Sequence, residues 1–326
     1  MAEVTPSVID ALRNLASGRP SRMVSFARTS DHRGERPLNT ARRYYAEELK
    51  YVAHIKSDAI VRAFAKVPRE KFLGAGPWRI AWGEKGWTTA DDDPKHLYHN
   101  ILVTIDPARG LNNGQPSFLA YLIDALELKA GEHVAHIGCG TGYYSAILAE
   151  IVGKRGRVTA VEIDRKLAAR AKRNLSPWRQ VSVVAADGSR CRLDAVDALL
   201  VNAGATHPAA IWLNALTPGG RMVLPLTAEN RFGSVLKVTR LASGYSAGFI
   251  SEVGIFPCAG VRSRRANHQL KAAFQSGTRS TVRSLRRDQH KRNRMCWLHG
   301  ADFCLSRTAV SDGTKKVKGS ARARGS

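Results

Sequence analysis

The sequence predicts an α/β protein with a doubly wound, mostly parallel sheet that ends in an antiparallel edge. Between residues 133 and 226, short apolar runs alternate with amphipathic segments, a pattern typical of parallel strands covered by helices on both faces. A glycine-rich turn follows the first apolar run. Two later runs, 234–240 and 248–254, are separated only by a short polar stretch, which indicates an antiparallel strand pair.

The first third of the chain is expected to lie outside this sheet. Residues 1–42 are predicted to form an N-terminal helix, within 1–20, and a flexible basic linker over 21–42. Residues 43–110 are expected to be a helical and irregular substrate-side region. Apolar residues recur every three or four positions from Thr40 to Lys66, as in an amphipathic helix. Residues 74–100 are rich in Gly, Trp, Asp and Pro, which predicts an irregular segment suited to a substrate loop.

Residues 111–262 are expected to form the main domain, because the alternating pattern lies within them. A helix is predicted from Pro116 to about Lys129, ahead of the first strand. The remaining predicted strands are 133–137, 157–162, 181–185, 198–201, 221–226, 234–240 and 248–254, and the remaining predicted helices are 143–152, 164–175 and 208–216.

The end of the chain divides into a basic extension at 263–308 and a disordered basic tail at 309–326. Short helices are predicted at 270–274 and 282–287, followed by a hairpin that pairs 296–298 with 303–305. Three residues of types that commonly bind metals lie close together in this part of the sequence: Cys296, His299 and Cys304. A structural zinc site usually takes four ligands, and the sequence shows no convincing fourth. We therefore expect no metal.

The charge of the chain is strongly positive. The net charge is +24, from 51 Lys and Arg against 27 Asp and Glu, and residues 262–326 hold 17 of the basic residues against 3 Asp. Such a field attracts nucleic acid without sequence specificity, although a solvated basic surface is an equally open interpretation. The five scattered cysteines favour reduced thiols, and no signal peptide or membrane-spanning run is evident. A cytoplasmic location without a membrane partner is expected.

The strongest functional signal is the glycine turn. Gly138, Gly140 and Gly142 stand between a predicted strand and a predicted helix, so the backbone can approach a ligand that faces the helix N-terminus. Glu162 follows 20 positions later, at the tip of the second strand, where an acid can accept hydrogen bonds from ribose hydroxyls. Dinucleotide sites have a third glycine at the position of Tyr143. The spacing therefore favours a nucleoside cofactor without a pyrophosphate.

This motif resembles the first motif of the S-adenosylmethionine-dependent methyltransferases, which have a Rossmann-like fold. The resemblance implies S-adenosyl-L-methionine as the cofactor, with Glu162 at the ribose. It places Asp187 and Gly188 near the adenine amino group. His136 and Asn202 are further candidates for contacts to the cofactor.

Within this superfamily the chain resembles the protein-L-isoaspartate O-methyltransferase family. The likeness rests on Val67-Pro68-Arg69-Glu-Lys-Phe72 and on the segments 126–134, 142–144 and 219–225. It implies carboxyl O-methylation of isoaspartyl residues, so the partner would be a protein or peptide with an acidic methyl acceptor. Two positions depart from the family pattern. His136 stands where an acid is usual, and Gly114 stands where a Ser-x-Pro motif has its serine.

A carboxylate acceptor needs no general base, because its reference pKa is about 4. The protein would act mainly by positioning the reactants. The candidates for catalytic residues are Asn113, Gly114 and Ser117, with Asn112 and Gln115 as further residues that could hold the acceptor; ordinary turn and helix-capping roles are equally open. His136 could be a general base, but a strand-end histidine satisfied by the backbone is favoured.

Three other functions remain open from the sequence. The acceptor could be a small molecule or another peptide group, or it could be nucleic acid. Methylation of exocyclic amines on nucleic acid is disfavoured, because the segment after Asn202 lacks the prolines of such enzymes. The chain could also be a cofactor-binding protein that no longer catalyses methyl transfer, as the histidine at position 136 suggests.

Overall fold

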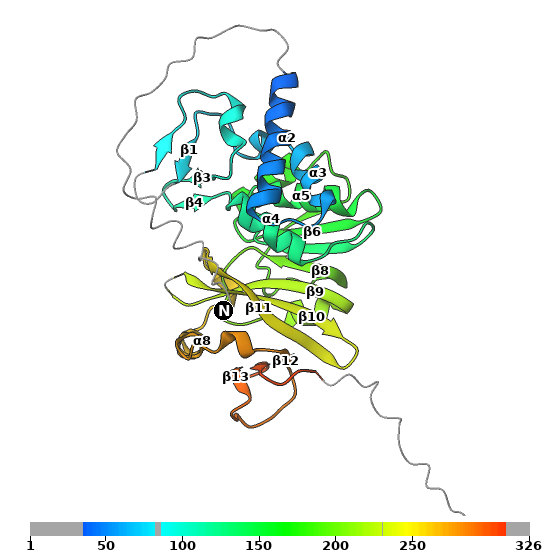
Figure 1. Ribbon diagram of the computed structural model, residues 1–326, viewed down its shortest axis with the longest axis vertical. Coiled ribbons are helices and arrows are strands. Elements are labelled where there is room, and N and C mark those ends of the chain that lie inside the picture. Colours follow the sequence, from blue (N-terminus) through cyan, green and yellow to red (C-terminus); the bar gives the residue numbers. More distant parts are fainter. Residues whose placement is uncertain (1–34, 82–85, 230, 311–326) are drawn as a thin grey trace, which may run out of the picture. The chain divides into compact units, whose positions relative to one another are not determined.

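The computed structural model describes residues 35–81, 86–229 and 231–310 (Figure 1). The predicted helix at 1–20 and the tail beyond 310 lie outside the described residues. The described residues from Pro37 onward belong to one compact unit. The predicted segments 43–110, 111–262 and 263–308 all contribute to it. Within the described ranges, no helix is both long enough and apolar enough to cross a membrane.

A parallel five-stranded sheet forms the centre of this unit. Its strands lie in the order β9-β8-β5-β6-β7, and all four neighbouring pairs are parallel. From β5 the chain continues to β6 and β7 on one side and to β8 and β9 on the other, which is the topological switch point where α/β sheets bind ligands. The bounds are β5 His133–Ile137, β6 Arg157–Glu162, β7 Val181–Ala185, β8 Val196–Val201 and β9 Leu216–Thr227. The predicted doubly wound α/β fold is confirmed.

Helices cover both faces of this sheet. Successive strand residues point to opposite faces, so Val134 packs in one buried cluster and Ala135 in another. The first cluster includes α2 to α6, and the second includes α7 and α8. The bounds are α2 Glu35–Val52, α3 Asp58–Lys66, α4 Pro116–Ala125, α5 Tyr143–Val152, α6 Arg165–Asn174, α7 Ala210–Ala215 and α8 Arg264–Gln275.

The antiparallel part of the sheet is larger than predicted. β10 (Phe232–Leu241) and β11 (Gly244–Gly254) form the predicted pair, but they are not the edge, because β12 (Ser284–Arg286), β14 (Cys304–Ser306) and β13 (Cys296–His299) extend the sheet further. The predicted helix at 282–287 is wrong. Leu285 is buried opposite Tyr245 of β11, so strand pairing decides the conformation of this short segment. The hairpin of β13 and β14 is confirmed.

The substrate-side region also differs from the prediction. The single helix expected over Thr40–Lys66 is two, because the chain turns at His54, which has a φ of 52°. The first of them, α2, already begins at Glu35, inside the expected linker, and Leu38 packs against the core. Segment 74–100 is not wholly irregular. It holds β1 (Arg79–Ala81), β2 (Trp87–Thr88) and the 3₁₀ helix η3 (Pro94–Leu97); β1 and β2 join β3 (Leu102–Asp106) and β4 (Leu111–Asn112) in a small sheet.

Candidate functional site

A cavity of about 710 Å³ opens at the carboxyl ends of the parallel strands. This volume lies in the usual range of small-molecule sites, roughly 300–1,000 Å³. The cavity is lined by the glycine turn and the tips of β6, β7 and β8 on one side, by the loop after β4 on another, and by residues 252–260 after β11. Among the predicted residues, the lining includes Asn113, Gly114, Gly138, Gly140, Glu162, Asp187, Gly188 and Asn202.

Glu162 fixes the conformation of the glycine turn through a hydrogen bond to its backbone. Gly138, Gly140 and Gly142 have φ values of 77°, 57° and 96°, in the left-handed region that favours glycine. The N–H of Gly140 donates to Oε2 of Glu162 at 2.8 Å, and the N–H of Asp164 donates to Oε1 at 3.0 Å. A carboxylate oxygen has two lone pairs, so each oxygen can still accept from a ligand hydroxyl. The buried carboxylate is therefore oriented toward the cavity before any ligand arrives.

Asp187 lies in a close-packed turn after β7 and lines the same cavity. Its Oδ1 accepts from the N–H of Ser189 at 2.9 Å and from the Ser189 hydroxyl at 2.7 Å. Gly260, from the turn after β11, packs against this carboxylate. A Cβ at Gly260 would lie 2.2 Å from Oδ1 of Asp187, so only glycine fits. No local sequence pattern marks Gly260, because the contact joins segments more than 70 residues apart.

His136 is not among the residues that line the cavity. It is fully buried in β5, and its Nδ1 lies 2.8 Å from Oγ of Ser145 in α5. Burial lowers the pKa of this imidazole to about 3, so the ring is neutral near pH 7. Nε2 has no hydrogen-bond partner. The geometry thus gives His136 a hydrogen bond to the helix that follows the glycine turn, and its predicted contact to a cofactor stays a prediction.

The loop after β4 lines another side of the cavity. Gly114 has a φ of 80°, a conformation that serine rarely adopts, and its carbonyl accepts from the Tyr144 hydroxyl at 3.0 Å. Asn113 is buried, with Oδ1 fixed by the N–H of Val103 at 2.9 Å. Its Nδ2 has no hydrogen-bond partner. Ser117 does not line the cavity.

The Val-Pro-Arg-x-x-Phe segment at residues 67–72 stabilises this loop through a chain of hydrogen bonds. The fully buried Arg69 donates to the carbonyl oxygens of Leu97, His99 and Ile101 at 2.6, 2.9 and 2.6 Å. These bonds fix the turn that carries Asn100. Oδ1 of Asn100 in turn accepts from Nε2 of Gln115 at 2.8 Å and from the N–H of Ser117 at 3.0 Å. Arg69 therefore positions the loop after β4 through Asn100.

Two arginines that the sequence did not single out also line the cavity. Arg109 pairs with Asp106 at 2.7 Å and with Asp164, the N-cap of α6. Arg231 places its guanidinium 5.1 Å from the centre of the Phe256 ring. Arg231 therefore adds a positive charge to the lining of the cavity, which also includes the carboxylate of Glu252.

Comparison with known proteins agrees with this geometry. Residues 42–252 match the family model described as Protein-L-isoaspartate(D-aspartate) O-methyltransferase (PCMT). Two relatives named protein-L-isoaspartate O-methyltransferase are similar. The Ignicoccus hospitalis protein is 30% identical over 200 residues, covering 59% of this chain and 84% of the relative. The Archaeoglobus fulgidus protein is 33% identical over 191 residues, covering 55% and 88%.

Solved structures show the same fold. A protein-L-isoaspartate O-methyltransferase aligns with a TM-score of 0.55 at 24% identity, over 71% of this chain and 69% of that one. A Plasmodium falciparum structure, described as a complex with S-adenosyl-L-homocysteine, aligns with a TM-score of 0.51 at 18% identity, over 67% and 97%. This chain belongs to the protein-L-isoaspartate(D-aspartate) O-methyltransferase family, a family of S-adenosylmethionine-dependent methyltransferases.

Proposed function

We propose that this protein transfers the methyl group of S-adenosyl-L-methionine to the free carboxylate of isoaspartyl residues in proteins or peptides. The observation that carries the proposal is that one cavity brings two loops together. The glycine turn with Glu162 lines one side, and the loop with Asn113 and Gly114 lines the other. A bound cofactor and an incoming carboxylate would therefore meet in the same cavity.

The residues present fit an adenosyl cofactor. A Cβ added at Gly140 would meet nothing within 4 Å, so there is open space beside the turn at the N-terminus of α5. Glu162 offers free lone pairs for ribose hydroxyls, and Asp187 offers Oδ2 for an amino group, with Arg190 3.7 Å away. The sulfonium of the cofactor supplies an electrophilic methyl group. Glu162, Asp187, Gly138 and Gly140, which line the cavity, would hold it, and Gly142, which does not line the cavity, would contribute through the conformation of the turn.

The chain's own contribution is to orient the acceptor and exclude water. A carboxylate is ionised near pH 7 and attacks without a general base, which agrees with the neutral, buried state of His136. Asn113 lines the cavity and has a buried Nδ2 without a hydrogen-bond partner, which a small side-chain movement could offer to the acceptor, and Arg231 adds positive charge. Fixing both reactants in one geometry supplies most of the rate enhancement expected for such a transfer.

The test is methyl transfer from radiolabelled S-adenosylmethionine to an isoaspartyl peptide, beside the aspartyl peptide of the same sequence. We expect label on the first peptide and only background on the second. Cofactor binding is measured separately by calorimetry. Tight cofactor binding with equal inactivity on both peptides would contradict the isoaspartyl acceptor but leave the methyltransferase assignment intact.

A second candidate partner is nucleic acid, and one surface observation favours it. Arg287, Lys291, Arg292 and Arg294 are all exposed in the loop between β12 and β13. We expect salt-dependent binding to a duplex of arbitrary sequence that weakens when the last three are changed to Gln. Binding that is unchanged in this variant would remove the loop as the contact. Deletion after Val261 is not a clean test, because it also removes α8 and three strands of the sheet.

We also place the protein in the cytoplasm. The support is that its five cysteines are all unpaired, as expected in a reducing compartment. Thiol labelling of denatured protein taken directly from cells is expected to modify all five. Labelling of three or fewer would argue against this location.

A further inference from the structure

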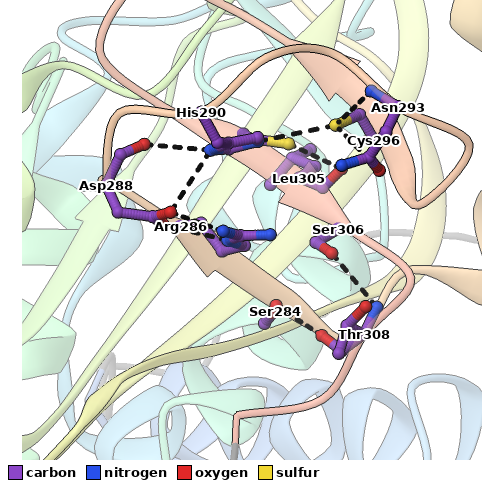
Figure 2. A network of polar contacts seen from close by, with 10 residues as sticks. Ser284, Arg286, Asp288, His290, Asn293, Cys296, Leu305, Ser306 and Thr308 are labelled. Atoms are coloured by element: carbon purple, nitrogen blue, oxygen red, sulfur yellow. Dashed lines mark hydrogen bonds and ion pairs between the residues drawn. The ribbon is translucent and has the colours of Figure 1, made fainter.

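Four side chains with metal-binding atoms gather in the C-terminal extension. His290, Cys296, His299 and Cys304 each offer one ligand atom, and these atoms lie within 4.8 Å of one another. The sequence showed three of them, and the structure adds His290 from the loop between β12 and β13 (Figure 2). The cluster lies beyond residue 252, where the family match ends. It is also distinct from the cavity, because none of its members lines that cavity.

A strand irregularity brings three of these side chains to one face. Residues three apart on a regular strand point to opposite faces, so Cys296 and His299 would diverge. β13 has a register shift between Cys296 and Leu298, and Cys296 then lies opposite Ser306 while His299 lies opposite Cys304. Since Cys304 and Ser306 are two apart, they share a face. A β-bulge that redirects a side chain in this way is a common feature of functional sites.

The surrounding contacts orient the ligand atoms toward one another. Nδ1 of His290 lies 3.0 Å from the carbonyl oxygen of Asp288 and 3.4 Å from its carboxylate. Asp288 is itself fixed by the Arg286 guanidinium, whose Nε donates to Oδ1 at 2.9 Å. With its proton on Nδ1, a neutral imidazole has a free lone pair on Nε2, and Nε2 lies 3.5 Å from Sγ of Cys296. Metal-bound histidines commonly have this carbonyl or carboxylate partner.

The surroundings of Cys296 and His299 also favour metal binding. The backbone N–H of Asn293 points at Sγ of Cys296 at 3.4 Å, a contact that stabilises a thiolate. His299 has a buried Nδ1 without a hydrogen-bond partner, and its ring centre lies 4.8 Å from that of His290. An orphaned ring nitrogen costs free energy unless something binds it.

We propose that His290, Cys296, His299 and Cys304 bind one zinc ion in a tetrahedral Cys₂His₂ site. Two thiolates and two imidazoles are the donor set of structural zinc, and the two thiolates neutralise the charge of the ion. Zinc–sulfur and zinc–nitrogen bonds of about 2.3 and 2.0 Å place neighbouring ligand atoms roughly 3.3–3.8 Å apart. The 3.5 Å between His290 and Cys296 falls in this range. Ligand atoms near the 4.8 Å limit would have to approach by about 1 Å when the ion binds.

The ion would stabilise a part of the chain with little core of its own. β12, β13 and β14 contain three, four and three residues. Their apolar residues pack in the second buried cluster of the main unit, so a bound metal would add to that packing. Zinc at this position ties the basic loop 287–295 to the hairpin. The site thus goes beyond methyl transfer and fixes the shape of the exposed basic loop.

Metal analysis of the full chain tests the proposal. Protein purified with a reductant and without a chelator is expected to contain about one zinc per chain by mass spectrometry. His290→Ala, Cys296→Ser and Cys304→Ser should each lose most of it. The matched controls, His268→Ala on the exposed face of α8 and Cys191→Ser, lie outside the cluster and should keep it. His290→Cys, which restores a fourth ligand, should also keep it.

A second measurement covers the case in which the cluster variants do not fold. Wild-type protein is stripped of metal and titrated with cobalt(II), whose absorption spectrum distinguishes tetrahedral thiolate coordination. We expect those bands to rise to about one equivalent and to disappear on addition of zinc. Wild-type protein that takes up neither metal would overturn the proposal. So would a disulfide between Cys296 and Cys304 in freshly purified protein, or equal zinc loss in the control variants.

Discussion

The buried His136 makes folding stability depend on pH in a way that can be calculated. Burial lowers its pKa from 6.5 to about 3, so the unfolded chain binds a proton below pH 6.5 that the folded protein does not. Stability is therefore complete above about pH 6.5 and falls as the pH decreases toward 3. Between pH 7 and pH 5 this single group lowers the free energy of unfolding by about 2 kcal/mol.

Replacement of His136 by Gln removes this titration and keeps a polar side chain beside Ser145. Urea unfolding of the wild type and of His136→Gln is measured at pH 7 and pH 5. We expect the loss between the two pH values to be smaller in the variant by about 2 kcal/mol. His268→Gln, on the exposed face of α8, should retain the wild-type loss. An equal loss in His136→Gln and wild type would refute a buried, neutral His136.

Three further predictions concern the cavity and its support. Glu162→Gln should weaken S-adenosylhomocysteine binding in calorimetry by roughly 10- to 100-fold, because a charged hydrogen bond contributes about 1.5–3 kcal/mol, whereas the exposed Glu48→Gln should not. Gly260→Ala places a Cβ 2.2 Å from Oδ1 of Asp187, so cofactor affinity should fall, and the melting temperature should also decrease because the turn is overpacked; unchanged affinity would remove Asp187 from the site. Arg69→Ala leaves three carbonyl oxygens without their donor and should cost about 3–5 kcal/mol of unfolding free energy, with Arg69→Lys intermediate; a loss under about 1 kcal/mol would contradict its buried role.

The cofactor side of the cavity could be predicted because its signals are local. A glycine turn after an apolar strand and an acid at the next strand tip are brought together by parallel pairing alone. Gly140 and Glu162 accordingly lie next to each other, joined by a hydrogen bond that the sequence did not predict. Their contacts to the cofactor, and those of Asp187, Gly188 and Asn202, stay predictions.

The features that the sequence did not predict depend on contacts between segments that are distant in the chain. Arg231 and Gly260 reach the cavity from turns after β9 and β11, and nothing local marks them. His290 joins the cysteines only because a loop folds back onto a bulged strand. The segment 282–287 is too short for its apolar pattern to distinguish a helix from a strand, and pairing with β11 decided it.

The added strands at the end of the sheet also bear on how the protein behaves at high concentration. Exposed sheet edges carry unpaired backbone groups that recruit other chains. β12 covers the part of β11 at Tyr245 and Ser246, and the hairpin packs Trp297 against Phe249. A chain that ends before α8 would expose both that edge of β11 and the aromatic side chain of Phe249. We expect such a truncation to aggregate in a concentration-dependent manner in light scattering, while the full chain remains dispersed.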